Sequence, residues 1–112
     1  MDSYIPKKGD LIYITLDPQA GHEQKGRRPA LVVSNTLFNW KTGMAVICPI
    51  TNTDRGFPFH LPVPSGFEVT GFVMVEQVKS VDFASRKARF ISHSPEGLLE
   101  NVMDLLGPVL NS

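Results

Sequence analysis

Proline and glycine interrupt this chain so often that only short secondary-structure elements fit between them. Nine prolines and nine glycines are spread over 112 residues. Several of the intervening segments are apolar and rich in β-branched residues, as in DLIYITLD (10–17), PALVVS (29–34) and MAVICPIT (44–51). Runs of this kind bounded by turn residues are typical of β-strands. The third run is apolar on both faces, so we expect it at the centre of a sheet.

The later segments extend this sheet. Further strands are predicted from FHLPV (59–63), GFVMVEQVKSVDF (71–83) and KARFIS (87–92). The total is then five to seven strands. The long middle segment turns polar at Glu76 and Gln77, where we expect it to bend or break. Between the second and third strands, NTLFNWKTG (35–43) predicts one short helix that ends at Gly43.

The last part of the chain has helical periodicity. Apolar residues recur at positions 98, 99, 102, 103, 105, 106, 109 and 110. We expect Ser94 as the N-cap, Pro95 at the first helical position and Glu96 in the first turn. Gly107–Pro108 should end or kink this helix. Short antiparallel strands followed by one amphipathic helix predict a mainly β fold, a strongly curved sheet or partly open barrel with the helix packed on it.

Composition restricts the classes of function. Eleven acidic and eleven basic residues balance, so the chain lacks the strong positive field of a general nucleic-acid binder, and any nucleic-acid site must be local. No apolar stretch approaches the length of a membrane span, and the N-terminus lacks the apolar core of a signal peptide. The single cysteine, Cys48, lies in an apolar run and should be a buried thiol. We therefore predict one domain over residues 1–112, located in the cytoplasm.

A long loop joins the first two predicted strands and contains several charged and polar residues. Its sequence, DPQAGHEQKGRRP (17–29), contains His22, Glu23 and Arg28. One interpretation is a solvated connection in which Glu23 and Arg28 form a surface ion pair contributing under ~1 kcal/mol. The other is a phosphate site, because Arg28 directly precedes a strand start and a positioned guanidinium presents a rigid fork of donors. Local sequence alone leaves both open.

Other polar and aromatic residues are also candidates with two interpretations. Thr51, at the end of the third strand, would either cap a turn or hold a phosphate oxygen. His22 and His60 would be general acids or bases, or polar surface. Four phenylalanines would stack on bases or belong to the core or a dimer interface: Phe57, Phe59, Phe67 and Phe72. The chain has no paired-cysteine or HExxH metal spacing, no phosphate-cradling glycine loop and no nucleophile elbow, so no metal or cofactor is predicted.

The combination of motifs is more specific than any one of them. The chain carries, in order, GDLIYITLDPQAGHEQKGRRPALVVSN, KTGMAVICPIT, the G-F-x-F of Gly56 to Phe59, EQVKSVD and a C-terminal amphipathic helix. In this order and spacing it resembles the MazF/PemK family of toxin endoribonucleases across nearly its whole length. The resemblance implies an SH3-like barrel that forms a homodimer, cuts single-stranded RNA without a metal, and is held inactive by a cognate antitoxin. It also implies products with a 2',3'-cyclic phosphate and a 5'-hydroxyl.

The resemblance also implies roles for particular residues. The family's catalytic arginine matches Arg28 of GRRP, its phosphate-contacting threonine matches Thr51 of PIT, and its loop glutamate matches Glu23 of HEQ. His22 matches only those members that carry GHEQ. Where the family usually has Asp before Gln-Val, this chain has Glu76, which is longer by one methylene, so RNA contact or loop support is expected there more than catalysis.

The chemistry of RNA cleavage fits these assignments. Attack by a ribose 2'-OH on its own 3'-phosphate needs a base, a proton for the departing 5'-oxygen, and positive charge for the phosphorane oxygens. We assign Arg28 to charge stabilisation, Glu23 or His22 to the base, and Thr51 to a non-bridging oxygen. The residues expected to contact RNA are Gln77, Lys79, Arg55, Arg86 and Glu76. An RNA groove that is basic only locally also predicts an antitoxin that is acidic over the segment covering it.

Two other classes of function are alternatives. A non-catalytic toxin of the same fold, similar to the gyrase poison CcdB, would act by binding a protein. The gyrase-directed end of that toxin is Trp-Gly-Ile, whereas this chain finishes VLNS and has only Trp40. A plain SH3-like binding module is the other alternative, and the joint presence of Arg28, Thr51 and Glu23 argues against it.

Overall fold

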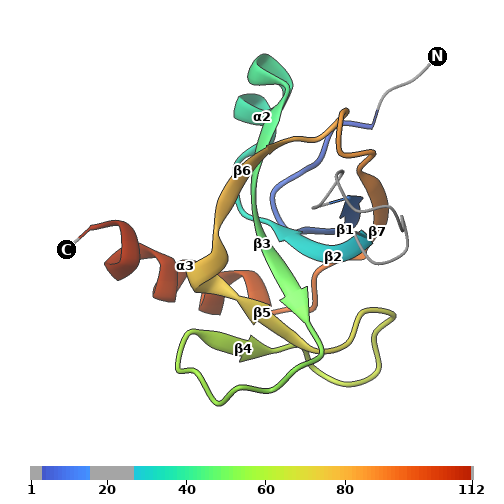
Figure 1. Cartoon of the computed structure of the whole chain (residues 1–112). Helices are drawn as coiled ribbons and strands as arrows, with labels where there is room; N and C mark the ends of the chain where they lie inside the picture. The colour runs from blue at the N-terminus through green and yellow to red at the C-terminus, as the bar shows by residue number, and fades with distance from the viewer. Residues whose placement is uncertain (1–3, 16–26, 112) are drawn as a thin grey trace.

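The protein is built on one strongly curved antiparallel sheet. A computed structural model describes residues 4–15 and 27–111, and Figure 1 shows their arrangement. Within these residues the sheet has seven strands: β1 (Asp10–Thr15), β2 (Arg27–Val32), β3 (Met44–Thr51), β4 (His60–Pro62), β5 (Phe72–Met74), β6 (Lys79–Asp82) and β7 (Arg89–His93). Their order is β4-β5-β3-β2-β1-β7, with β6 also paired to β3. The expectation of a mainly β, curved antiparallel sheet with a C-terminal helix is confirmed.

Strand β3 is the centre of this arrangement, as its two-faced apolar pattern predicts. One of its edges pairs with β2, while β6 and β5 pair with successive parts of the other edge. Ile47 lies opposite Lys79 of β6, and farther along β3 Thr51 lies opposite Phe72 of β5. Strand β3 therefore holds both halves of the curved sheet together.

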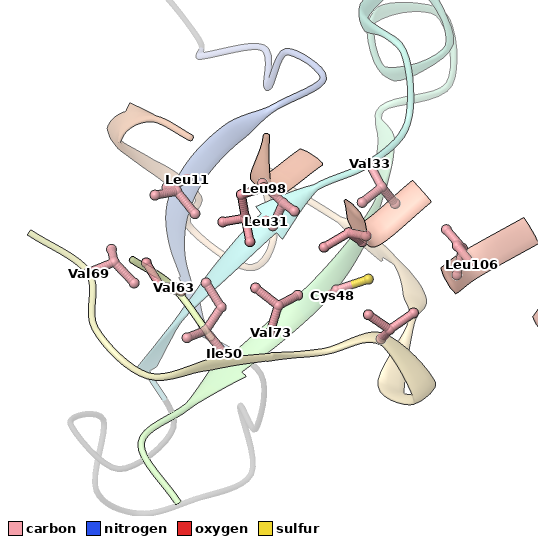
Figure 2. Close-up of a cluster of buried hydrophobic side chains, with 12 residues drawn as sticks. Leu11, Leu31, Val33, Cys48, Ile50, Val63, Val69, Val73, Leu98 and Leu106 are labelled. Atoms are coloured by element: carbon pink, nitrogen blue, oxygen red, sulfur yellow. The ribbon is translucent and has the colours of Figure 1, made fainter. Parts of the chain in front are cut away.

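One core lies between the sheet and the C-terminal helix α3 (Leu98–Leu110) (Figure 2). Leu11, Leu31 and Cys48 come from neighbouring strands and point to this face because side chains alternate along a strand. From the helix, Leu98, Val102 and Leu106 are spaced four residues apart and form the stripe that meets them. The predicted amphipathic face of the helix is thus buried on the sheet.

A second core lies on the opposite face of the same strands. It contains Ile12, Ile14, Ala30, Val32, Ala45, Ile47, Val81 and Phe83. Tyr4 and Ile5, which precede β1, pack against it. Because both faces of β1, β2 and β3 are covered, polar side chains reach solvent mainly where these strands end.

The predicted start of the C-terminal helix is wrong by about one turn. The helix begins at Leu98 with Gly97 as its N-cap, and no side chain caps it. Gly97 has φ 88°, a left-handed conformation that cannot continue a helix, so Ser94, Pro95 and Glu96 lie before the helix, with Glu96 and Gly97 in a turn.

The helix also continues through Pro108, contrary to the expected end at Gly107–Pro108. It runs to Leu110, and the N–H of Asn111 donates to the carbonyl of Gly107. Pro108 lies in the last turn, where it removes only one backbone donor. Neither helix among the described residues is long and apolar enough to cross a membrane.

The other predicted elements agree with the structure to within a few residues. The short helix α2 (Thr36–Thr42) starts at an Asn35 cap and ends at Gly43, which has φ 72°. Strand β2 begins two residues before the predicted PALVVS run and ends at Val32. The predicted break in the 71–83 segment is a 3-10 turn, η1 (Val75–Gln77), between β5 and β6.

The Cys48 thiol gives a direct test of the first core. The side chain is fully buried, and its burial, reinforced by the charge of Glu76, raises the thiol pKa to about 12. At pH 8 the thiolate fraction is then lower by about a thousandfold than at the ordinary pKa. We expect native protein to react with a thiol-specific disulfide reagent at least a hundred times more slowly than urea-unfolded protein, the rates being followed by absorbance. Equal rates would contradict the buried position.

Candidate active site

Strand register places Arg28 and Thr51 at the same end of the sheet. The pairing of β2 with β3 runs from Val32 opposite Ile47 to Ala30 opposite Pro49, two residues short of Arg28 and Thr51. On its other side Arg28 pairs with Ile14 of β1. Because side chains alternate along a strand, Arg28 and Thr51 both lie on the face that carries Ala30 and Ile47. The two residues matched to catalytic roles therefore share one face and one end of the sheet, although 23 positions separate them in the chain.

Arg28 is positioned by the strand and is open to solvent. It lies in β2 with an exposed side chain, whereas Ala30 and Leu31 two and three residues farther on are fully buried. The expectation that Arg28 is held near the sheet is confirmed. Its guanidinium is therefore carried on a rigid backbone but remains free to approach a ligand from solvent.

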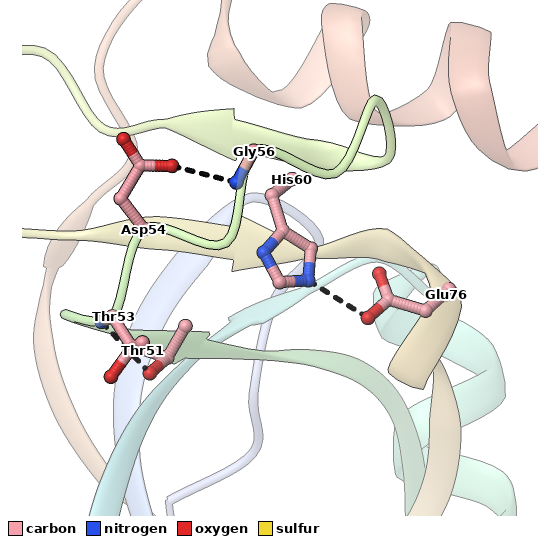
Figure 3. A network of polar contacts seen from close by, with 6 residues as sticks. All are labelled: Thr51, Thr53, Asp54, Gly56, His60 and Glu76. Carbon is pink, nitrogen blue, oxygen red and sulfur yellow. Dashed lines mark hydrogen bonds and ion pairs between the residues drawn. The ribbon is translucent and has the colours of Figure 1, made fainter.

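The Thr51 hydroxyl has a defined place at the end of β3. Its Oγ1 accepts a hydrogen bond of 3.2 Å from the backbone N–H of Thr53 (Figure 3). This is the turn-capping role that its position predicted. Because the hydroxyl acts only as acceptor in that bond, its own hydrogen is not used there and can be donated to a phosphate oxygen. Turn capping and phosphate contact are thus compatible in one residue.

Gly71 closes the back of this site. It has φ 115°, and a Cβ at this position would lie 2.3 Å from the carbonyl oxygen of Thr51. Its own carbonyl accepts a hydrogen bond of 2.8 Å from Val63. The segment before β5 therefore packs directly against the backbone of Thr51, at a distance that only glycine permits.

Two further arginines lie at the same end of the sheet. Arg27 lies opposite Thr15 of β1, and its guanidinium carbon is 4.8 Å from the ring centre of Tyr13. Arg86 donates from Nη1 to the Thr15 carbonyl at 3.2 Å, and the Thr15 N–H donates to the Arg86 carbonyl at 2.9 Å. Arg86, an expected RNA contact, is thus half-buried, and it holds the end of β1 beside the start of β2.

The loop carrying two predicted catalytic residues lies outside the described residues. His22 and Glu23 belong to the segment 16–26, and their assignment as base remains a prediction. The ends of that segment are described: β1 stops at Thr15 and β2 starts at Arg27, and these two residues are paired. The loop therefore leaves and rejoins the sheet immediately beside Arg28.

Glu76 and His60 form a side-chain hydrogen bond that the sequence did not reveal. The Nε2 atom of His60 is 2.8 Å from Oε2 of Glu76 (Figure 3). The His60 side chain is 2% exposed, so the interpretation of His60 as polar surface is wrong. Glu76 is 30% exposed and lies in η1. The only signal available in the sequence was the alternation in FHLPV, which gives no indication of the partner.

The other expected RNA contacts lie in η1, β6 and the β3–β4 loop. Gln77 ends η1, and Lys79 begins β6 opposite Ile47. Arg55 is in the loop between β3 and β4. All three side chains are exposed, so each can reach a ligand, but they extend from the Arg28–Thr51 end toward the middle of β3 and do not form one compact cluster.

Three of the four phenylalanines are not core residues. Phe57, Phe59 and Phe67 are 50%, 37% and 41% exposed, and Phe72 is partly buried opposite Thr51. The core alternative is therefore wrong for the first three, while base stacking or a dimer interface stays open. Among the described residues no group of three or more His, Cys, Asp or Glu side chains is placed to hold a metal ion.

Comparison with known proteins shows the family to which this chain belongs. The family model for the PemK-like, MazF-like toxin of type II toxin-antitoxin systems matches residues 7–110. The chain belongs to the MazF/PemK family. It is 45% identical over 85 residues to the endoribonuclease toxin MazF of Escherichia coli K12, covering 76% of each chain. It is also 32% identical over 108 residues to the endoribonuclease PemK of Escherichia coli, covering 93% of this chain and 81% of PemK.

Solved structures of the MazF/PemK family share the fold. A crystal structure of MazF from Deinococcus radiodurans matches with a TM-score of 0.88 and 39% identity, covering 98% of this chain and 100% of that chain. A MazE–MazF complex from the same organism matches with a TM-score of 0.86 and 37% identity, over 96% of this chain and 97% of that one. The seven-stranded sheet and the two helices are therefore those of the MazF fold.

Proposed function

We propose that this protein is the toxin of a type II toxin-antitoxin system and acts as a metal-independent endoribonuclease on single-stranded RNA, with messenger RNA as its target. The observation that carries the proposal is that the paired strands β2 and β3 carry Arg28 and Thr51 at the same end of the sheet, with the Arg28 side chain open to solvent. Membership of the MazF/PemK family supports it, since the curated relatives are named endoribonucleases.

The proposed reaction uses a nucleophile that RNA itself supplies. The 2'-oxygen forms a bond to the adjacent phosphorus while the bond to the 5'-oxygen breaks, which leaves a 2',3'-cyclic phosphate and a 5'-hydroxyl. Glu23 or His22 takes the 2'-OH proton, and the 5'-oxygen gains a proton as it leaves. DNA lacks this hydroxyl, so selectivity for RNA follows from the chemistry.

Arg28 and Thr51 would stabilise the charge that this reaction develops. Arginine is a poor proton donor because its pKa is above ~12, but its guanidinium fork fits two phosphoryl oxygens. The Thr51 hydroxyl, held by Thr53, donates to a third oxygen. Since both residues are fixed on paired strands, these donors need little rearrangement when the substrate binds.

The proposed partners follow from the same surface. Bases would be contacted by Gln77, Lys79, Arg55, Arg86 and Glu76. An antitoxin with an acidic binding segment would cover this surface, and complexes of MazE with MazF are known for Deinococcus radiodurans. We also propose a homodimer, which is supported by the exposed apolar side chains of Val109 and Leu110 at the end of α3.

Incubation with RNA and DNA tests the proposed function. The purified protein is mixed with a long single-stranded RNA in excess EDTA, beside DNA of the same sequence, and each new end is mapped and chemically identified. We expect cuts in RNA alone, at a recurrent short sequence, with cyclic phosphate on one side and 5'-hydroxyl on the other. Intact RNA from folded, antitoxin-free protein would favour a CcdB-like binding toxin or an inactive module instead.

A further inference from the structure

His60 is an unusual residue for its surroundings. Its side chain is 2% exposed beneath the β3–β4 loop, and its ring centre is 5.1 Å from that of Phe57. The Nδ1 atom is buried and finds no hydrogen-bond partner among the described residues. A buried polar atom without a partner reduces stability, so a histidine kept in such a place calls for a function that an aliphatic residue would not provide.

Among the described residues, the ring has one polar contact, and it connects two segments that carry proposed RNA contacts. With the Glu76 carboxylate as acceptor, Nε2 of His60 donates the hydrogen of the 2.8 Å contact. His60 is the first residue of β4, directly after the loop of residues 52–59, and Glu76 is the middle residue of η1. Figure 3 shows the two side chains meeting between strand β4 and the turn that follows β5.

Backbone contacts and the buried Val75 side chain connect the same two segments at the start of the turn. The Val75 N–H donates to the Phe59 carbonyl at 3.0 Å, and His60 pairs with Met74 in the β4–β5 ladder. Beyond Val75 the turn is closed by one bond of 3.2 Å, from the Val78 N–H to the Val75 carbonyl. Glu76 and Gln77 are exposed. The His60–Glu76 contact is therefore the side-chain contact that fixes the part of η1 facing solvent.

We propose that His60 is a positioning residue for RNA binding: through Glu76 it holds η1, which carries Gln77, against the aromatic end of the 52–59 loop. This inference rests on the proposed function, because it concerns the surface assigned to RNA. The His60–Glu76 hydrogen bond keeps Gln77 and the exposed rings of Phe57 and Phe59 in one arrangement before RNA binds. A ligand then meets a surface that is already ordered, which lowers the entropy lost on binding.

The inference predicts an effect on RNA affinity and not on the chemical step. The segments joined by the His60–Glu76 contact lie along β4, β5 and η1, whereas Arg28, the residue assigned to the chemical step, belongs to β2. We expect His60→Ala to weaken binding about tenfold, as loss of a charge-assisted hydrogen bond does. Glu76→Ala should weaken binding at least as much, because Glu76 is itself an expected RNA contact. In His60→Ala the cleavage rate at saturating RNA should not change. Affinity is measured with RNA that carries a 2'-deoxyribose at the attacked position.

A matched pair of substitutions at His60 distinguishes the effect of the hydrogen bond to Glu76 from the effect of side-chain packing. His60→Gln places an amide N–H near the position of Nε2 and should restore binding, whereas His60→Asn places it near Nδ1 and should not. The double variant His60→Ala/Glu76→Ala should bind RNA no more weakly than Glu76→Ala alone, because the contact with His60 is already lost in that single variant. Glu100→Ala, an exposed carboxylate on α3, is the control for loss of one negative charge.

Limited trypsin digestion tests the His60–Glu76 contact in the absence of RNA. Cleavage after Arg55, in the exposed 52–59 loop, should become several-fold faster in His60→Ala, His60→Asn and Glu76→Ala, while cleavage after Lys87 in the β6–β7 turn stays as in the wild type. If the wild type neither binds nor cuts RNA but digestion responds as expected, the proposed function is wrong, while the structural role of the His60–Glu76 contact is supported. Unchanged digestion in Glu76→Ala, a site outside the buried core, or equal behaviour of His60→Gln and His60→Asn, would overturn the inference.

Discussion

Replacing Arg28 with alanine should lower the rate of RNA cleavage by about a hundredfold to a thousandfold, which corresponds to ~3 to 4 kcal/mol of barrier. Arg28 lies at the same end of the paired strands β2 and β3 as Thr51, and its side chain is exposed, so its loss removes charge stabilisation without disturbing the core. Arg28→Lys keeps the charge but not the planar fork and should give an intermediate rate. Single-turnover cleavage of a short RNA measures each rate.

Arg27 provides the matched control for this prediction. It is the neighbouring residue on the same strand and carries the same charge, but alternation directs it to the other face, where it lies over Tyr13. Arg27→Ala should therefore reduce the rate far less than Arg28→Ala. Similar losses for both variants would show that net positive charge at this end of the sheet matters, and not a positioned donor. Near-normal cleavage by Arg28→Ala would refute its catalytic assignment.

Replacing Gly71 with alanine should destabilise the fold by about 3 kcal/mol or more. The new methyl group would lie 2.3 Å from the Thr51 carbonyl oxygen and 2.9 Å from the Asn52 side-chain oxygen, and φ at this residue is 115°. Steric overlap with backbone and an unfavourable conformation each contribute about 1–3 kcal/mol. Because the overlap is with Thr51 itself, the remaining folded protein should also cleave RNA more slowly. Urea unfolding gives the change in free energy.

Gly56 separates the two causes in Gly71→Ala. It also has positive φ, 67°, but a Cβ added there would meet no atom within 4 Å. Gly56→Ala should cost only about 1 kcal/mol, the penalty of the left-handed conformation. If the two variants lose the same stability, the close packing of Gly71 on Thr51 does not contribute.

The sequence predicted most of the sheet because its local and long-range signals agree. MAVICPIT is apolar on both faces because β3 pairs on both edges and has a core on each side. The polar Glu76–Gln77 pair marked the 3-10 turn correctly for the same reason, since polar residues there face solvent. The helix start failed because Gly97 adopts a left-handed conformation, and this overrides the capping signals of Ser94 and Pro95.

The candidate site was predictable in its residue types but not in its full arrangement. Arg28 and Thr51 were identified from motifs, and only the pairing of β2 with β3 shows that they lie at the same end of the sheet. The His60–Glu76 contact joins residues 16 positions apart through a turn and a strand pairing, so no local pattern contains it. The glycine that packs on Thr51 was equally hidden, because the need for a missing Cβ arises only from the approach of β5.

A single 2'-deoxy substitution in the RNA tests the central claim most directly. Once the cleaved sequence is mapped, an oligonucleotide is made that lacks only the 2'-OH on the ribose preceding the broken bond, and it is incubated with the wild type in EDTA. The account predicts that cleavage at that bond disappears, since the nucleophile is gone, while the oligonucleotide still binds and inhibits cleavage of normal RNA. Cleavage at the same bond at an unchanged rate would show that another nucleophile, such as water or a side chain, attacks the phosphorus.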